Sequence, residues 1–290
     1  MDDATLRLII FLTVLLLMAW LEWIAPRRVL RFGYKRWPAN LGIVVLDALM
    51  VRIVLPAGAV GAALWAQELN FGLFHWLAGF DGLNLPGALI VFIAVVLLDL
   101  AIYAQHVLFH ALPILWRLHL VHHADRDIDV TTGLRFHPIE ILLSMIIKIT
   151  LVMLLGAPVL AVIIFEVVLN AMAMFNHANV ALPLKLDGWL RWLLITPDVH
   201  RIHHSIHRHE TNSNYGFNLS VWDRLFGTYR AQPQDGHDDM VIGLQHLQDE
   251  PTHKLAFMLR LPFGSHIGQY PILKRDGLDR NGLKQNNPKG

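Results

Sequence analysis

Residues 87–110 read GALIVFIAVVLLDLAIYAQHVLFH, and this stretch decides what kind of molecule the chain forms. From Gly87 to Tyr103 it is almost entirely apolar, and it then carries His106 and His110 four residues apart. A helix over the whole stretch is about 36 Å long at 1.5 Å per residue. That length exceeds the ~30 Å thickness of the hydrocarbon core of a bilayer. We therefore predict a membrane-spanning helix that presents two histidines on one face at the membrane boundary.

Four other apolar stretches also indicate a membrane protein: 6–25, 41–66, 139–155 and 160–175. Pro56 marks a kink in the second, and a Gly-Ala-Pro turn at 156–158 joins the last two. Hydrophobic residues make up 54% of the chain and charged residues 16%, whereas a soluble domain carries roughly 25% charge. We predict an all-α fold, with a multi-pass stalk of about four to five spanning or re-entrant helices and a histidine-rich helical cap.

The predicted organisation has three parts. Residues 1–86 hold the N-terminal membrane spans, residues 87–230 hold a histidine-rich catalytic region, and residues 231–290 form a polar extension whose end, after Lys274, is expected to be disordered. The net charge of +1 indicates no nucleic-acid partner. The absence of cysteine excludes thiolate metal sites and disulfides.

The basic residues predict the orientation in the membrane. Residues 67–86 contain no Lys or Arg, whereas the loop after the first span is strongly basic. Basic loops favour the cytoplasmic side, so we expect a multi-pass integral membrane protein whose histidine cap lies on that side. The basic residues of the first loop are Arg27, Arg28, Arg31, Lys35 and Arg36.

The 17 histidines carry the candidate chemistry. The motif H-x-x-H-H occurs twice, at 119–123 and at 200–204, and positions i, i+3 and i+4 share one helix face. We expect each copy to present three imidazoles toward a common point. We also expect Pro113 to end the helix before the first copy, and residues 114–118 to form an interfacial turn that leads into it. Neutral imidazole is the commonest metal ligand, and eight to ten imidazoles are too many for one ion, so two ions are predicted. Imidazole ligands alone leave iron, zinc, copper and nickel open.

These motifs resemble the fatty acid hydroxylase/sterol desaturase superfamily of membrane di-iron enzymes. The resemblance runs from about Leu89 to Tyr229. It includes Asp99 seven residues before His106, the sequences Phe136-His137-Pro138 and Asn176-His177, and Asn214-Tyr215-Gly216 followed by a Trp-Asp-Arg-Leu-Phe-Gly-Thr stretch at 222–228. The implied metal ligands are His106, His110, His119, His122, His123, His137, His177, His200, His203 and His204.

The resemblance implies a membrane-bound di-iron oxygenase. Two irons, which zinc can replace in a purified form, would activate O2 to hydroxylate or desaturate an unactivated C–H bond of a lipid. Electrons would come from NAD(P)H through a reductase and a separate ferredoxin or small haem cytochrome. Some members have a further histidine shortly after the position of His177, but Asn179 and Val180 stand here. The ligand count therefore stays open, with His137 or His207 as substitutes.

Several polar residues are candidates for supporting the metal ligands. Asp99 lies inside an apolar span, where we expect its carboxylate to accept the second N–H of a ligand histidine; the alternative is an ion pair with Arg52. Asn214 and Asp223 are candidates for hydrogen bonds to ligands, although packing and capping explain them equally well. Glu140 and Asp198 flank the motifs, and either could join the site, because soluble di-iron proteins use carboxylates together with histidines. We favour solvated or capping roles for both and leave them outside the ligand set.

Three other functions remain as alternatives. Desaturation by the same kind of centre is not separable from hydroxylation by sequence, although we favour a hydroxylase. A zinc-dependent membrane lipid hydrolase would need only three or four ligands. A metal transporter would place ligands along a path near the bilayer midplane, where the sequence offers no histidine. Dependence on O2 separates an oxygenase from both of the latter.

Overall fold

The structure, a computed structural model, describes residues 3–79, 85–265 and 267–273. Within these residues it consists of helices and loops, and the only β pairings there are isolated bridges. This confirms the predicted all-α fold. The predicted disorder after Lys274 concerns residues outside the described part. The longer helices are α1 (Asp3–Ile24), α2 (Trp37–Val54), α3 (Gly58–Glu68), α5 (Gly87–Ala111), α6 (Pro113–His123), α7 (Pro138–Leu155) and α8 (Val159–His177).

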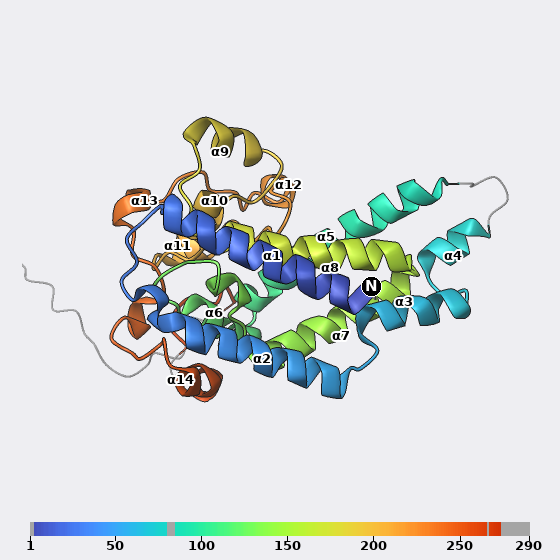
Figure 1. Cartoon of the computed structure of the whole chain (residues 1–290), viewed down its shortest axis with the longest axis horizontal. Helices are drawn as coiled ribbons and strands as arrows, with labels where there is room; N and C mark the ends of the chain where they lie inside the picture. Colours follow the sequence, from blue (N-terminus) through green and yellow to red (C-terminus); the bar gives the residue numbers. More distant parts are fainter. Residues whose placement is uncertain (1–2, 80–84, 266, 274–290) are drawn as a thin grey trace, which may run out of the picture.

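Shorter helices build the remainder of the cap and the far end of the stalk. They are η1 (Gly33–Arg36), α4 (Leu73–Ala78), η2 (Thr132–Leu134), α9 (Leu184–Leu190), α10 (Pro197–His203), α11 (Arg208–Thr211), α12 (Val221–Leu225), α13 (Gly236–Asp239), η3 (Gln245–Leu247), α14 (Leu255–Arg260) and η4 (Leu261–Phe263). In Figure 1 the long helices run side by side, and most of the short ones gather at one end of them.

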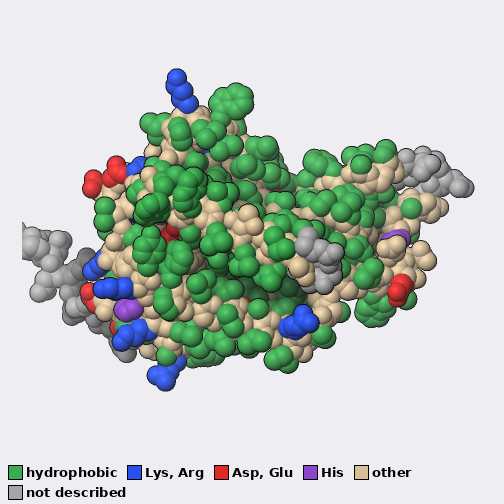
Figure 2. All heavy atoms as spheres, viewed as in Figure 1, with side chains coloured by type: hydrophobic (Ala, Val, Ile, Leu, Met, Phe, Trp, Pro, Cys, Tyr) green, Lys and Arg blue, Asp and Glu red, His purple; other side chains and the backbone are tan. Residues whose placement is uncertain are grey.

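Five segments of the described chain are long and apolar enough to cross a membrane: Thr5–Ile24, Gly33–Ala78, Gly87–Ala111, Pro138–Leu155 and Val159–His177. Hydrophobic side chains cover much of the stalk surface in Figure 2. On α1, for example, Leu16 and Trp23 are 68% and 71% exposed. Such an apolar exterior suits contact with lipid rather than water, and the chain is an integral membrane protein. Its orientation remains a prediction.

The second predicted span is interrupted more strongly than expected. The sequence predicted a kink at Pro56, whereas the structure ends α2 at Val54 and starts α3 at Gly58. Pro56 has no N–H to continue the helical bonds, and Gly58 adopts a φ of 59°, which glycine accepts easily. After this break α3 packs against α7 and α8, close to the turn that joins them.

The helices of the stalk pack against one another in pairs and bring their ends together at the cap. α1 packs against α8, α2 packs against α7, and α5 packs against both α7 and α8. The predicted turn between α7 and α8 is confirmed, because Gly156 ends α7 in the left-handed conformation with a φ of 60°. This hairpin returns the chain to the cap, where His177 is the last residue of α8.

One local prediction about the cap is wrong. Residues 114–118 were expected to form an interfacial turn, but they belong to α6. Pro113 does end the preceding helix, as expected, yet it also stands at the first position of α6, where a proline needs no N–H partner. Trp116 is fully buried between α6 and the C-terminal segment and donates its indole N–H to the carbonyl of Ile267 at 2.9 Å. The histidines at 119–123 therefore project from a well-anchored helix.

Candidate metal centre

Nine of the ten histidines proposed as ligands gather into two buried groups. In each group one nitrogen per residue lies within 4.8 Å of all the others. The five-histidine group contains His106, His110, His119, His123 and His203. The four-histidine group contains His122, His177, His200 and His204. All nine side chains are buried, with exposed fractions of at most 4%.

The two H-x-x-H-H motifs are shared between the groups. His119 and His123, at i and i+4 of the first motif, join the five-histidine group, whereas His122 at i+3 joins the other. The second motif does the reverse: only its i+3 residue, His203, joins the five-histidine group. The prediction that each motif faces one common point is therefore wrong. The reason is helical geometry, since positions i+3 and i+4 point about 100° apart.

The Nε2 atoms converge in both groups. In the five-histidine group, Nε2 of His106 lies 3.1 Å from Nε2 of His119 and 3.1 Å from Nε2 of His203. In the four-histidine group, Nε2 of His177 lies 3.0–3.2 Å from the Nε2 atoms of its three partners. Metal–nitrogen bonds of about 2.1 Å place neighbouring ligand nitrogens about 3 Å apart, so this spacing matches a coordination shell.

The other ring nitrogen, Nδ1, is engaged on several of these histidines. In four of them Nδ1–H donates to a backbone carbonyl. The donor and acceptor residues are His106 and Tyr215 (2.8 Å), His203 and Ser213 (2.7 Å), His177 and Ala173 (2.7 Å), and His122 and Arg135 (3.2 Å). A carbonyl can only accept, so Nδ1 carries the proton. The tautomer is thereby fixed with Nε2 available as a ligand.

The Nε2 atoms of the two histidine groups are arranged to bind cations. Burial, helped by neighbouring imidazoles, lowers the pKa of His119, His122, His123, His200, His203 and His204 well below the ordinary value. A neutral His203 that donates from Nδ1 has only a lone pair on Nε2, and that lone pair faces Nε2 of His106. Nε2 of His110 and of His123 has no hydrogen-bond partner at all in the described residues. A metal ion removes both problems, because it accepts every one of these lone pairs.

Glu140, which the sequence placed beside the motifs but for which we favoured a role outside the site, contacts a candidate ligand directly. Its Oε1 lies 2.6 Å from Nδ1 of His119, and both side chains are almost fully buried. The expected solvated role is therefore wrong, whereas the expected capping role is borne out, because Glu140 in the first turn of α7 also interacts with the backbone of His137, the N-cap residue. A carboxylate that accepts from Nδ1–H orients the ring and makes Nε2 a better ligand. The available signal was a carboxylate in the first turn of a largely apolar helix, α7.

Two of the predicted supporting residues act on a loop rather than on a ligand side chain. Asp223 accepts hydrogen bonds from the backbone N–H groups of Tyr215 and Gly216, at 2.8 and 2.7 Å. The amide of Asn214 donates to the carbonyls of Val199 and Arg230, and its φ of 53° turns the chain sharply. These contacts hold the loop whose carbonyls orient His106 and His203.

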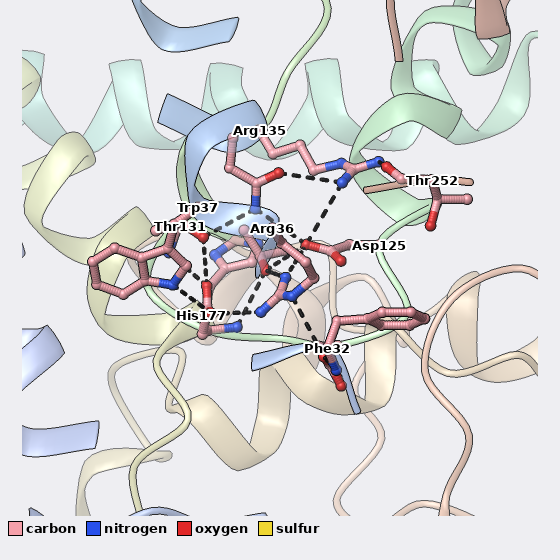
Figure 3. Close-up of polar contacts among 12 residues, drawn as sticks. Phe32, Arg36, Trp37, Asp125, Thr131, Arg135, His177 and Thr252 are labelled. Atoms are coloured by element: carbon pink, nitrogen blue, oxygen red, sulfur yellow. Dashed lines mark hydrogen bonds and ion pairs between the residues drawn. The ribbon is translucent and has the colours of Figure 1, made fainter. Parts of the chain in front are cut away.

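A buried ion-pair network supports the four-histidine group, and Figure 3 shows its members. Arg36 pairs with Asp125 and Asp129, while Arg135 donates to the carbonyl of Thr252 at 2.7 Å. Desolvation favours the neutral form of Asp125, but the charges of Arg36 and Arg135 outweigh it and hold the pKa of Asp125 below its ordinary value. The network fixes Arg135, whose carbonyl orients His122.

Asp99 has a different partner from the one expected. Its Oδ2 accepts the indole N–H of Trp222 at 2.8 Å. No bond to a ligand histidine and no ion pair with Arg52 is seen within the described residues. The i+7 spacing places Asp99 on the same side of α5 as His106, but two turns deeper, where α12 covers the helix. Asp99 therefore anchors α12 to the stalk.

His137 and His207 lie outside both histidine groups. Nδ1 of His137 accepts the backbone N–H of Ile139 at 3.2 Å and so caps the N-terminus of α7. His207 pairs with Asp235 through Nε2 at 2.6 Å and is partly exposed. Asp198 belongs to neither histidine group, and its carboxylate pairs with Arg201 and Arg27. The geometry thus brings neither of the proposed substitute ligands to a metal position.

A cavity of about 560 Å³ extends from the five-histidine group into the stalk. His106, His119 and Glu140 line its cap end, and Lys148 lies eight residues further along α7, about 12 Å deeper. In Figure 2 the surface is hollowed between α1 and α2, the two helices that form its outer walls. Most of the remaining lining is apolar, for example Phe11, Val14, Val44, Phe109, Met145 and Leu169.

Fold and site together define a class: a helical membrane protein with two buried all-histidine groups, suited to metal ions, at the end of a largely apolar cavity. Comparison with known proteins agrees with this class. Residues 91–228 match the family model described as fatty acid hydroxylase. Over this segment the chain is similar to the fatty acid hydroxylase family, and the resemblance predicted from the sequence is confirmed.

Curated relatives match about half of the chain. The ornithine lipid hydroxylase OlsE of Rhizobium tropici is 34% identical over 157 residues, which is 54% of this chain and 46% of that protein. Alkylglycerol monooxygenase of Homo sapiens is 32% identical over 51% of this chain and 31% of that protein. Cholesterol 25-hydroxylase of Rattus norvegicus is 26% identical over 49% and 47%. The chain thus spans less than half the length of each of these relatives. No solved structure matches it.

Proposed function

We propose that this chain is a membrane-bound di-iron oxygenase that uses O2 to hydroxylate an unactivated C–H bond of a lipid. The observation that carries the proposal is the convergence of nine buried histidines, through two sets of Nε2 atoms, at the head of a largely apolar cavity. The names of the relatives, all hydroxylases or monooxygenases acting on lipids, support it. Iron bound there would supply the O2-activating chemistry.

The ligand assignment follows the two groups. The five-histidine group would hold one iron and the four-histidine group the other. His137 leaves the proposed ligand set because its Nδ1 is already used as a helix cap. Glu140 joins as the partner that orients His119, and Asp223 and Asn214 act through the loop that receives the N–H groups of His106 and His203.

The chain's own residues would position the lipid and exclude water. Phe136 stacks on His122 with ring centroids 4.4 Å apart and also lines the cavity. Gly133 leaves room for the four-histidine group, because a Cβ there would lie 2.3 Å from the carbonyl oxygen of Ala173 and 3.0 Å from Nδ1 of His177. The apolar walls would hold a hydrocarbon chain by the same burial that drives helix packing. Removing water protects a reactive oxidant from side reactions.

Electrons would come from a separate ferredoxin or small haem cytochrome supplied by an NAD(P)H reductase. The basic loop between α1 and α2 favours a cytoplasmic location for the cap, where such a donor would reach it. Zinc would occupy the same nitrogens without supporting turnover, since it undergoes no redox change.

The test combines metal analysis with lipid analysis. Purified protein should contain close to two irons per chain, and lipids from cells that express it should include a species heavier by one oxygen atom. The modified lipid should disappear without O2 and in a His106→Ala variant. A species lighter by two hydrogens would instead assign desaturation. Product formed equally well without O2, or protein that holds only zinc when active, would overturn the proposal.

A further inference from the structure

Three buried oxygen atoms in the cavity have no hydrogen-bond partner in the described part of the chain. They are Oδ1 of Asp47, Oε1 of Gln105 and Oε2 of Glu140. All three residues line the cavity, and Asp47 and Glu140 are only 7% and 4% exposed. Buried acceptors without donors are costly, so this part of the cavity is built to receive something that donates.

The orientation of these acceptors is fixed by the surrounding helices. Gln105 donates its amide N–H to the hydroxyl of Ser144 at 2.8 Å. This hydrogen bond fixes the orientation of the amide and does not use its Oε1. Ser144 lies one turn beyond Glu140 on α7, and both line the cavity. Asp47 comes from α2, which packs against α7, and it lies close enough to Glu140 to interact with it electrostatically.

The basic side chains that line the cavity form ion pairs with another carboxylate, not with Asp47 or Glu140. Arg7 and Lys148 both pair with Glu166, at 2.5 and 3.0 Å, in the deeper part of the stalk. Asp47 forms no ion pair in the described residues, and the polar partners of Glu140 there are the ring of His119 and the backbone of His137 rather than a cation. Two carboxyl groups within electrostatic range in a low-dielectric cavity favour a positive charge between them. An ammonium group has that charge and three N–H donors.

We propose that Asp47, together with Gln105 and Glu140, forms a subsite for the ammonium group of an amine-bearing lipid. The subsite borders His106 and His119, so a bound amine would hold the neighbouring carbons of the lipid beside the five-histidine group. Asp47 is then a specificity-determining residue, since it contacts the substrate and no metal ligand. That the subsite serves a substrate rests on the proposed hydroxylase function, whereas the binding of an amine to it does not.

Binding of simple probes tests the subsite independently of turnover. Tritiated hexadecylamine, 1-hexadecanol and hexadecyltrimethylammonium are compared on the full metal-loaded chain in detergent without O2, by scintillation proximity. A charge-assisted hydrogen bond lost from a buried site weakens binding by roughly tenfold or more. We expect the amine to bind at least tenfold more tightly than the alcohol. The quaternary probe has the charge but no N–H, and we expect it to bind more weakly than the amine.

The variant Asp47→Asn should reduce amine binding at least tenfold while changing alcohol binding little. Glu68→Gln, a change at an exposed carboxylate at the end of α3, serves as the matched control and should leave both affinities unchanged. Metal content and thermal melting report whether Asp47→Asn still folds. Equal affinities of the unaltered chain for amine and alcohol would overturn the inference without any variant. An amine preference in a chain that shows no hydroxylation would keep the subsite and contradict only the proposed function.

Discussion

Replacing Glu140 by glutamine should weaken metal binding without removing a single ligand. Glu140 Oε1 lies 2.6 Å from Nδ1 of His119, and the two side chains are 5% and 3% exposed. Loss of such an outer partner typically lowers metal affinity by about 10- to 100-fold, which corresponds to about 1.4–2.7 kcal/mol. Glutamine keeps an oxygen that can accept from Nδ1–H but loses the charge, so we expect a loss near tenfold. Glu140→Ala removes the acceptor, and we expect a loss near 100-fold.

Metal affinity is measured by competition with a chelator of known affinity, followed by elemental analysis. The matched control is Glu166→Gln, the same change on another carboxylate that lines the cavity but pairs with Arg7 and Lys148 instead of a histidine. It should leave metal affinity within about twofold of the unaltered chain. If Glu140→Gln and Glu140→Ala also stay within that range, the carboxylate does not act through His119 and the reasoning fails.

Three further predictions concern the surroundings of the centre. Arg36→Met leaves the buried carboxylate of Asp125 without its closest cation and should lower the free energy of unfolding by about 3–5 kcal/mol in denaturant titrations; an unchanged midpoint would contradict the network. His137→Ala should keep the full metal content and lose only about 1 kcal/mol of stability through the lost helix cap, whereas His122→Ala should lose metal from the four-histidine group. Equal metal losses in the two variants would restore His137 as a ligand. Burial lowers the pKa of His237 to about 4, so its imidazole binds a proton more readily in the unfolded chain, and the free energy of unfolding should fall as the pH drops from about 6.5 to about 4. His237→Gln should make this pH dependence shallower, and an unchanged dependence would refute the role given to His237.

The parts of the fold that depend on local patterns could be predicted from the sequence. The apolar run up to Tyr103 and the turn at Gly156 are properties of consecutive residues, and the structure contains both. The break at Pro56 was located correctly but underestimated as a kink. Its extent depends on the packing of α3 against α7 and α8, which sequence neighbours do not determine.

The candidate site was predictable in membership but not in arrangement. Spacing alone selected the histidines at 106–110, 119–123 and 200–204, and all eight lie in the two groups. How each motif divides between the groups depends on the angle at which α6 and α10 meet, which is a tertiary property. The same holds for Glu140, because its contact with His119 joins α7 to α6. His137 illustrates the opposite error, since a histidine before a proline also suits a helix cap.

Iron-edge anomalous scattering from crystals of the iron-loaded chain tests the central claim most directly. The account predicts two anomalous peaks per chain, one bonded to Nε2 atoms of the five-histidine group and the other to those of the four-histidine group. A single peak, or iron bound at residues outside these nine histidines, would contradict it.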